Sequence, residues 1–128
     1  MIKQFLVAFG SFLAVDGLWL GLVAKNFYSK HLGYLLAKNP NFVAAGVFYL
    51  IYIFSLVVIV ISPGLQKGSM SHTVLMGALF GFCCYATYDL TNMATIKDWP
   101  LIVTLVDLVW GTVLSASITA ITYLILKK

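Results

Sequence analysis

The sequence predicts an all-α integral membrane protein: a bundle of four transmembrane helices with a short interfacial helix after the first span. Two observations lead to this fold class. The chain of 128 residues is 62% hydrophobic and only 9% charged, with a mean hydropathy of +1.00, whereas about a quarter of the residues of a soluble domain are charged. It also contains four apolar stretches of roughly the 20 helical residues that cross a hydrocarbon core. The connections are short, so we expect a single four-helix domain over residues 1–128.

Turn signals bound the four spans. We place them at residues 4–24, 42–62, 72–93 and 101–125. Between the first two, apolar residues from Phe27 to Leu35 recur at helical spacing among lysines until Asn39-Pro40, which predicts a short helix lying in the membrane interface. Pro63-Gly64 predicts the end of the second span.

The lysines do not orient the chain in the membrane. Four lie on the side of the termini, Lys3, Lys67, Lys127 and Lys128, and four on the other side, Lys25, Lys30, Lys38 and Lys97. The positive-inside rule therefore favours neither orientation. Their positions at the ends of spans predict snorkelling at the interface and no nucleic-acid partner.

Small residues recur four positions apart in three of the spans. They are Gly17 and Gly21, Gly77 and Gly81, and Gly111, Ser115 and Thr119. This spacing lets helix backbones approach closely. We therefore expect spans one, three and four to form the tight core of the bundle.

Three of the four aspartates, Asp16, Asp89 and Asp107, lie inside predicted spans. An ionised carboxylate there costs several kcal/mol unless it is paired, and such residues usually mark function. Because successive spans alternate in direction, all three fall in the same half of the bundle, about 6 to 12 Å from the span ends at 1.5 Å per residue. The predicted spans contain no lysine or arginine. At least one acid is therefore expected to hold a proton or to bind a cation.

Aromatic and polar residues gather in the same half, several of them one helical turn apart. They predict a pocket that opens to one membrane face, with aromatic walls and a floor of carboxyl groups. The predicted ligand- or proton-binding residues are Asp16, Trp19, Tyr49, Tyr52, Tyr85, Tyr88, Asp89, Asn92, Asp107 and Trp110. Tyr28, Tyr34 and Trp99, at span ends, are interpreted as interfacial anchors. The D-x-x-W sequence at Asp16 recurs at Asp107 on a span of opposite direction, which we interpret as coincidence.

The leading functional hypothesis is a binding or transport protein with proton linkage. Carboxylates and aromatic faces attract a small cationic or hydrogen-bonding ligand, and a complete translocation path through such a narrow unit would require a homo-oligomer. An intramembrane enzyme with paired Asp89 and Asp107 is the alternative, although the Gly-x-Gly-Asp motif of intramembrane aspartyl proteases is absent before Asp107. A lipid-modifying hydrolase also stays open, as does a structural subunit whose acids bond helices together.

Metal and cofactor chemistry has little support in the sequence. No histidine lies within the cores of the predicted spans, because His31 and His72 lie near opposite interfaces. The adjacent Cys83 and Cys84 diverge by about 100° on a helix, so no zinc site, haem or structural disulfide is indicated. Three aspartates with an asparagine could hold a hard cation. We predict no dedicated metal site, and the sequence identifies no cofactor and no catalytic residue.

Several segments together resemble an uncharacterised bacterial family of small predicted membrane proteins, a domain of unknown function. They are DGLWLG at residues 16–21, Phe27-Tyr28, YATYDLTNMATIKDWP at residues 85–100 and VDLVWG at residues 106–111. The resemblance covers essentially the whole chain. It implies four helices in the bacterial inner membrane and supplies no activity.

Overall fold

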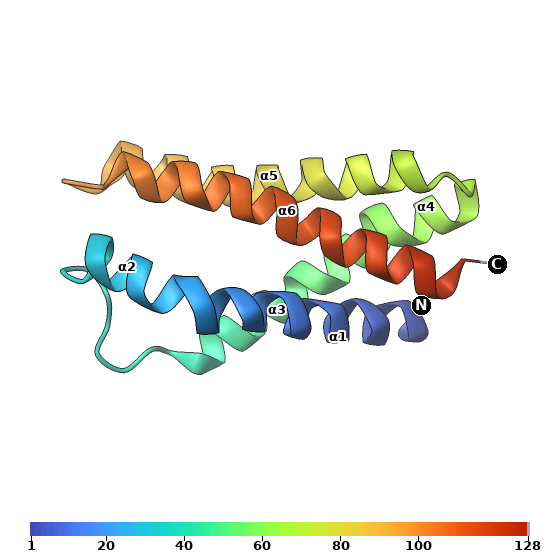
Figure 1. Cartoon of the computed structure of the whole chain (residues 1–128), viewed down its shortest axis with the longest axis horizontal. Helices are drawn as coiled ribbons and strands as arrows, with labels where there is room; N and C mark the ends of the chain where they lie inside the picture. Colours follow the sequence, from blue (N-terminus) through green and yellow to red (C-terminus); the bar gives the residue numbers. More distant parts are fainter. Residues whose placement is uncertain (128) are drawn as a thin grey trace.

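The computed structural model describes residues 1–127 and is helical over most of its length (Figure 1). Four helical rods are long and apolar enough to cross a membrane: Ile2–Leu32, Phe42–Lys67, Met70–Thr95 and Leu101–Leu126. The protein is therefore all-α with four candidate spans, as the sequence predicts. Both termini lie at the same end of the molecule (Figure 1). Lys128, counted above with the lysines of that end, lies outside the described residues.

The first rod joins α1 (Ile2–Trp19), the π-helical η1 (Leu20–Ala24) and α2 (Lys25–Leu32). Ala24 and Lys25 both keep right-handed helical backbone angles, with φ of −62° and −55°. The prediction of a separate interfacial helix is wrong, because nothing between residues 24 and 25 breaks the hydrogen-bonded ladder. The eight residues of α2 add about 12 Å to the first span at 1.5 Å per residue.

The second rod joins α3 (Phe42–Leu56), η2 (Val57–Ile61) and α4 (Ser62–Lys67). Asn41 begins it by accepting a hydrogen bond from the backbone N–H of Ala44 at 3.0 Å. The prediction that the helix ends at Pro63-Gly64 is wrong. The π-helical turn of η2 widens the helix just before Pro63. Pro63 lies in the first turn of α4, where a backbone N–H has no partner within the segment, so its missing N–H costs no hydrogen bond. Gly68 ends the rod in the left-handed conformation at φ 76°.

The third and fourth rods, α5 (Met70–Thr95) and α6 (Leu101–Leu126), form an antiparallel hairpin packed along its length. Small residues allow this approach. A Cβ added at Gly77 would strike Thr119, and one added at Gly81 would strike the Gly111 carbonyl and Ser115. The prediction of a small-residue seam is confirmed for these two helices.

The first rod departs from that prediction. It packs against α6, but a Cβ added at Gly17 or Gly21 would meet nothing within 4 Å. The two glycines lie on the exposed face of the rod, so they do not contribute to its packing within one chain.

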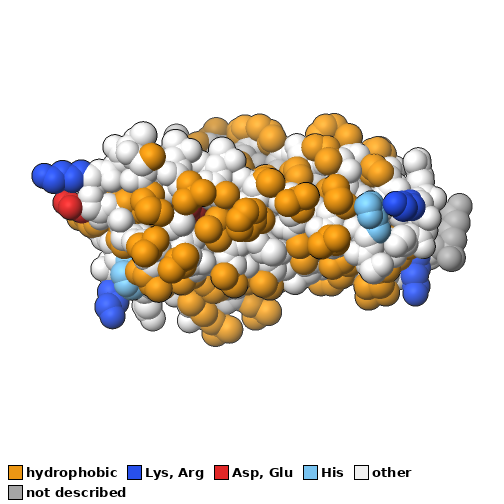
Figure 2. All heavy atoms as spheres, turned by 90° about the horizontal axis from the view of Figure 1, so that it is seen from above, with side chains coloured by type: hydrophobic (Ala, Val, Ile, Leu, Met, Phe, Trp, Pro, Cys, Tyr) orange, Lys and Arg blue, Asp and Glu red, His pale blue; other side chains and the backbone are white. Residues whose placement is uncertain are grey.

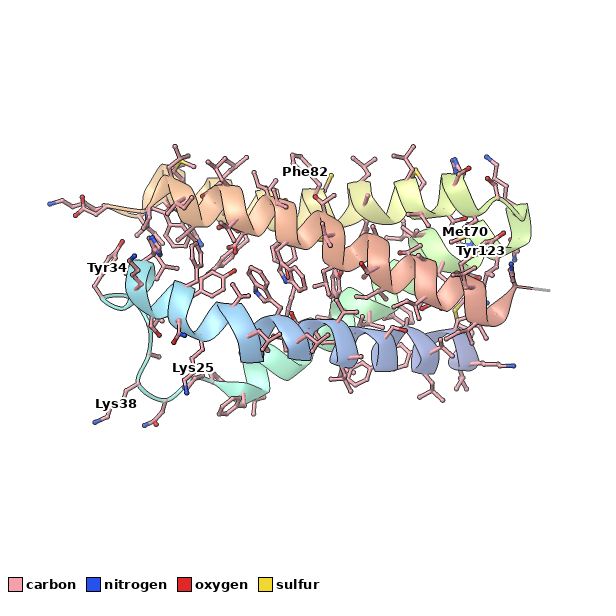
Figure 3. All side chains as sticks on the ribbon, viewed as in Figure 1. Lys25, Tyr34, Lys38, Met70, Phe82 and Tyr123 are labelled. Carbon is pink, nitrogen blue, oxygen red and sulfur yellow. The ribbon has the colours of Figure 1, made fainter. Side chains whose placement is uncertain are left out.

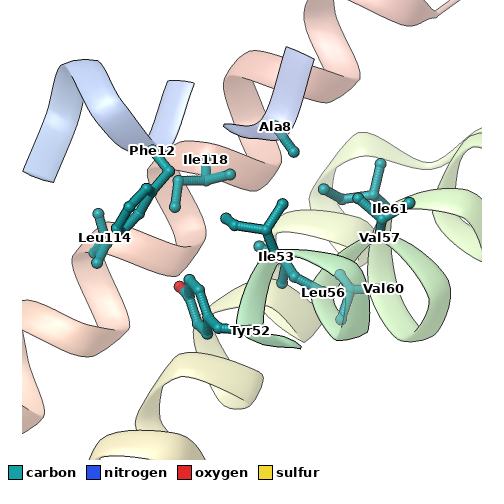
Figure 4. Packing of buried hydrophobic residues seen from close by; sticks show 10 residues of the cluster. All are labelled: Ala8, Phe12, Tyr52, Ile53, Leu56, Val57, Val60, Ile61, Leu114 and Ile118. Atoms are coloured by element: carbon teal, nitrogen blue, oxygen red, sulfur yellow. The ribbon is translucent and has the colours of Figure 1, made fainter. Parts of the chain in front are cut away.

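The apolar core lies between α1, α3, η2 and α6 (Figure 4). Its members are Ala8, Phe12, Tyr52, Ile53, Leu56, Val57, Val60, Ile61, Leu114 and Ile118. Most come from the first half of α1, the second half of the second rod and the second half of α6. The core therefore occupies the half of the bundle nearer the termini, and the opposite half is left for the aspartates.

The surface agrees with a position in the membrane. Apolar side chains cover the middle of the face drawn in Figure 2, and the lysines lie at its two ends. Lys25 and Lys38 lie at one end with Tyr34, whereas Met70 and Tyr123 lie at the other (Figure 3).

Candidate functional site

Asp89 of α5 and Asp107 of α6 face each other in the hairpin. Asp89 is 0% exposed and Asp107 is 5% exposed, and their carboxyl groups lie within hydrogen-bonding range of each other. Among the described residues neither carboxylate oxygen of Asp89 finds a donor. The two helices carry a single basic residue, His72, near the start of α5 and far from this pair. The pair can hold one proton or one cation.

Tyr28 of α2 supplies the donor that Asp107 uses. Its hydroxyl donates a short hydrogen bond to Oδ1 of Asp107. The prediction that Tyr28 is merely an interfacial anchor is wrong, because the first rod continues past residue 24 and carries this tyrosine alongside α6. An unbroken helical reading of residues 16–32 would have placed Tyr28 within the bundle.

Asp16 lies near the middle of the first rod and is also buried, at 8% exposure. The indole of Trp110 lies close to its carboxyl group. Tyr49, Tyr52 and Tyr85 lie within electrostatic range of its carboxyl group. Asp16 therefore forms a second polar group, deeper in the bundle than the Asp89–Asp107 pair.

Tyr85 connects the two groups. Its ring covers Gly111, where a Cβ would strike it. It also lies within electrostatic range of Asp107, Asp16 and Tyr52. The predicted site thus divides into two clusters along the bundle axis, with this tyrosine between them.

Trp19 and Trp110 stack on one another beside these clusters. Their ring centroids are 4.4 Å apart and their planes differ by 11°. The D-x-x-W segments at Asp16 and Asp107 therefore meet across two antiparallel helices, because each tryptophan lies one turn beyond its aspartate. The interpretation of this echo as coincidence overlooked that opposite helix directions bring the two segments together.

Two of the predicted site residues lie apart from both clusters. Tyr88 is 60% exposed, and its ring meets that of Trp99 edge-on at 6.3 Å. Asn92 is half-buried and lies next to Tyr88. Successive side chains on a helix point about 100° apart. Because Asp89 points into the hairpin, Tyr88, the residue before it, points toward the outside.

The three aspartates line neither of the two cavities described here for residues 1–127. An apolar groove of about 390 Å³ runs beside the tryptophan pair, lined by Trp19, Leu105, Val106, Val109, Trp110 and Val113. A larger cavity of about 840 Å³ lies at the end of the molecule that carries the termini. Within residues 1–127 no three histidine, cysteine or acidic side chains gather as metal ligands.

Comparison with known proteins places the chain in a family. The family described as "Predicted membrane protein (DUF2177)" matches residues 1–124. No curated protein and no solved structure matches the chain. The match covers nearly all of the sequence, and the four apolar rods agree with its description. The chain is an integral membrane protein that belongs to the DUF2177 family of predicted membrane proteins.

Proposed function

We propose that the whole chain works as one proton-linked unit that binds or transports a small cation or hydrogen-bonding molecule in a bacterial inner membrane. In this proposal Asp89 and Asp107 hold an exchangeable proton. One observation carries it: Asp89 is completely buried, both of its carboxylate oxygens lack a donor in the described chain, and it faces a second buried carboxyl group.

The physical basis is charge repulsion. Two carboxylates about 4 Å apart repel each other by about 4 kcal/mol at an effective dielectric constant of 20. Neighbouring acids relieve this cost by sharing one proton, which neutralises one of them. Since no basic side chain lies nearby on α5 or α6, a proton or a bound cation is the available source of positive charge.

Asp16 is the proposed contact for the transported or bound molecule. It lies beside the stacked pair Trp19 and Trp110, which borders the apolar groove of about 390 Å³. Aromatic faces next to a carboxylate favour an organic cation, because the ring quadrupole adds to the attraction of the charge. Tyr49, Tyr52 and Tyr85 supply further hydroxyl groups in the neighbourhood of Asp16.

The test is the thermal stability of the purified protein across pH, with a panel of metal cations and organic amines. A ligand that binds the folded state raises the melting temperature. At a ligand concentration of a hundred times the dissociation constant, the folded state is stabilised by about 2.7 kcal/mol. We expect at least one cation or amine to stabilise the wild type and to lose that effect in Asp16→Asn. Asp89→Asn and Asp107→Asn should alter the pH dependence of the effect.

Asp98→Asn is the matched control, because Asp98 lies in the connection between α5 and α6 and is exposed. This variant should behave as the wild type throughout. If no compound stabilises the protein at any pH, or if the Asp98→Asn variant loses the response as fully as Asp16→Asn does, the proposal fails.

The paired carboxyl groups also favour a second candidate, an intramembrane hydrolase that uses Asp89 and Asp107 to activate water. It predicts cleavage of a peptide or lipid ester in a reconstituted bilayer, abolished in both Asp89→Asn and Asp107→Asn, whereas Asp16→Asn keeps some activity. The proton-linked binding protein shows no such cleavage. A purely structural subunit shows neither cleavage nor a ligand response.

A further inference from the structure

A row of buried hydroxyl groups continues from the acid clusters along α6. Ser115, Thr119 and Thr122 are each 0% exposed, and Tyr123 is 5% exposed. Ser115, Thr119 and Thr122 follow one another at intervals of four and three residues, which places them on one face of the helix, and Tyr123 lies one turn beyond Thr119. This row passes through the half of the bundle that is otherwise apolar.

Thr119 and Thr122 differ from the other buried serine and threonine side chains of the described helices, each of which has a hydrogen-bond partner. Hydroxyls in membrane helices commonly donate to the carbonyl four residues earlier. Thr112 does so to Leu108 at 2.7 Å, and Thr73 to Ser69 at 2.6 Å. The hydroxyls of Thr119 and Thr122 have no hydrogen-bond partner among residues 1–127. Thr119 directs its hydroxyl toward Gly77 of α5.

The row has a polar neighbour at its inner end. Ser115 exchanges a short hydrogen bond with the hydroxyl of Tyr52. Tyr52 in turn lies within electrostatic range of Tyr85 and Asp16. The ring of Tyr85 covers Gly111, which lies one helical turn from Asp107 on one side and from Ser115 on the other.

The outer end of the row reaches the large cavity. Tyr123 lines this space of about 840 Å³, at the end of the molecule where the termini lie (Figure 3). Gln4, which also lines the cavity, has a buried side-chain oxygen with no donor in the described chain. The other polar side chains of its lining are Lys3, Ser62, Gln66 and Lys127. Polar side chains are thus present from the carboxyl pair to the opposite membrane face.

We propose that this hydroxyl row is a proton path that connects the acid clusters to the terminal cavity and so gives the site access to both membrane faces. The inference rests on the proposed function, because it needs an exchangeable proton at the acids. Each hydroxyl accepts a proton on its oxygen and releases its own proton to the next acceptor. The net result is the movement of one proton, with no oxidant or reductant required.

The spacing fits such a path. Ser115 and Thr119 are about 6 Å apart along the helix axis, and Thr119 and Thr122 about 4.5 Å. A hydrogen bond between oxygens spans about 2.8 Å, so one water molecule between neighbours completes the connection. Buried hydroxyls that do not bond to their own helix are suitable partners for such a water.

Proton flux into liposomes tests the proposal. The wild-type protein is reconstituted with an enclosed pH-sensitive dye, and a pH gradient is applied with a potassium–valinomycin clamp. Thr119→Val and Thr122→Val remove one hydroxyl each at nearly constant volume. We expect each to lower the flux roughly tenfold, which is the effect of about 1.4 kcal/mol on a barrier. Thr119→Ser keeps the hydroxyl and should conduct as the wild type does.

Thr112→Val is the control on the same helix, because its hydroxyl already bonds to Leu108. This variant should keep the wild-type flux. Asp89→Asn should lose it. The cation and amine response of the melting temperature is measured on the same preparations, and we expect Thr119→Val and Thr122→Val to keep it.

If the wild-type protein carries no proton flux but keeps its cation or amine response, the proton path is overturned and the site is open to one face only. Wild-type flux in both valine variants also overturns it. Failure of the proposed function is a different result: no compound stabilises the wild type in the melting assay.

Discussion

The indole ring of Trp19 lies flat against that of Trp110, with 4.4 Å between the ring centroids. This contact joins the first rod to α6 at the level where Asp16 and Tyr85 lie between the helices. Neither ring is fully buried. The pair therefore lies between the acid clusters and the apolar groove, and part of each ring stays at the surface.

The stack should appear as an energetic coupling between the two tryptophans. In a double-mutant cycle with Trp19→Leu and Trp110→Leu, we expect a coupling of about 0.5–1.5 kcal/mol in the free energy of unfolding, because stacked aromatic pairs contribute this much beyond their buried area. The measurement is equilibrium unfolding in detergent micelles. A parallel cycle of Trp110→Leu with Trp99→Leu should give no coupling, since Trp99 pairs with Tyr88 instead.

Glycines of the hairpin and of the first rod should respond in opposite ways to alanine. Gly81→Ala places a Cβ against the Gly111 carbonyl and Ser115, so we expect a loss of about 1–3 kcal/mol through overpacking. Gly17→Ala places its Cβ in open space, and the helix propensity of alanine should stabilise the rod by up to about 1 kcal/mol. Equilibrium unfolding of the two variants compares them directly. Equal losses would contradict the close α5–α6 contact.

The hydrogen bond from Tyr28 should be measurable by removing one oxygen atom. Tyr28→Phe leaves the buried Asp107 carboxyl group without its tyrosine donor, and we expect a loss of about 1–3 kcal/mol in the free energy of unfolding. Tyr34→Phe is the matched control, because that hydroxyl is exposed and donates to the Asp98 carbonyl. Its effect should stay within about 0.5 kcal/mol. If Tyr28→Phe leaves the free energy of unfolding unchanged, α2 does not dock on α6.

Much of the fold follows from the sequence because membrane spans have a strong signal. Hydropathy and length identify all four rods, and the glycines at positions 77, 81 and 111 identify the hairpin contact. The ends of the rods are harder to predict. Lys25 and Lys30 indicate an interface, yet α2 continues the helix, since the backbone gains hydrogen bonds by continuing and lysine side chains can extend to the interface.

The acids of the site could be predicted from the sequence, and so could the stacked tryptophans beside them, whereas the positions of Tyr28 and Tyr88 could not. Asp89 and Asp107 stand out because acidic residues are rare in apolar spans. The antiparallel direction of the two spans brings them to the same depth. The helix periodicity that groups Tyr88 with Asp89 does not say which of them points inward, because that depends on the rotation of α5 against α6. Tyr28 was assigned to the interface because the first rod was expected to end eight residues earlier.

Asparagine at the two paired acids should change stability in opposite directions. Asp89 has no donor among the described residues and faces Asp107. Asp89→Asn removes a buried group without a partner and supplies an amide that can donate to Asp107, so we expect the free energy of unfolding to rise by about 1–3 kcal/mol. Asp107→Asn replaces the acceptor of the Tyr28 hydroxyl with a weaker, uncharged one, so we expect a loss of about 1 kcal/mol or more. Equilibrium unfolding without added ligand measures both variants.

A more stable Asp89→Asn protein means that the native aspartate is kept for function at a cost in stability. A less stable one means that Asp89 holds helices together, and the structural-subunit interpretation then explains the pair better than a proton site does.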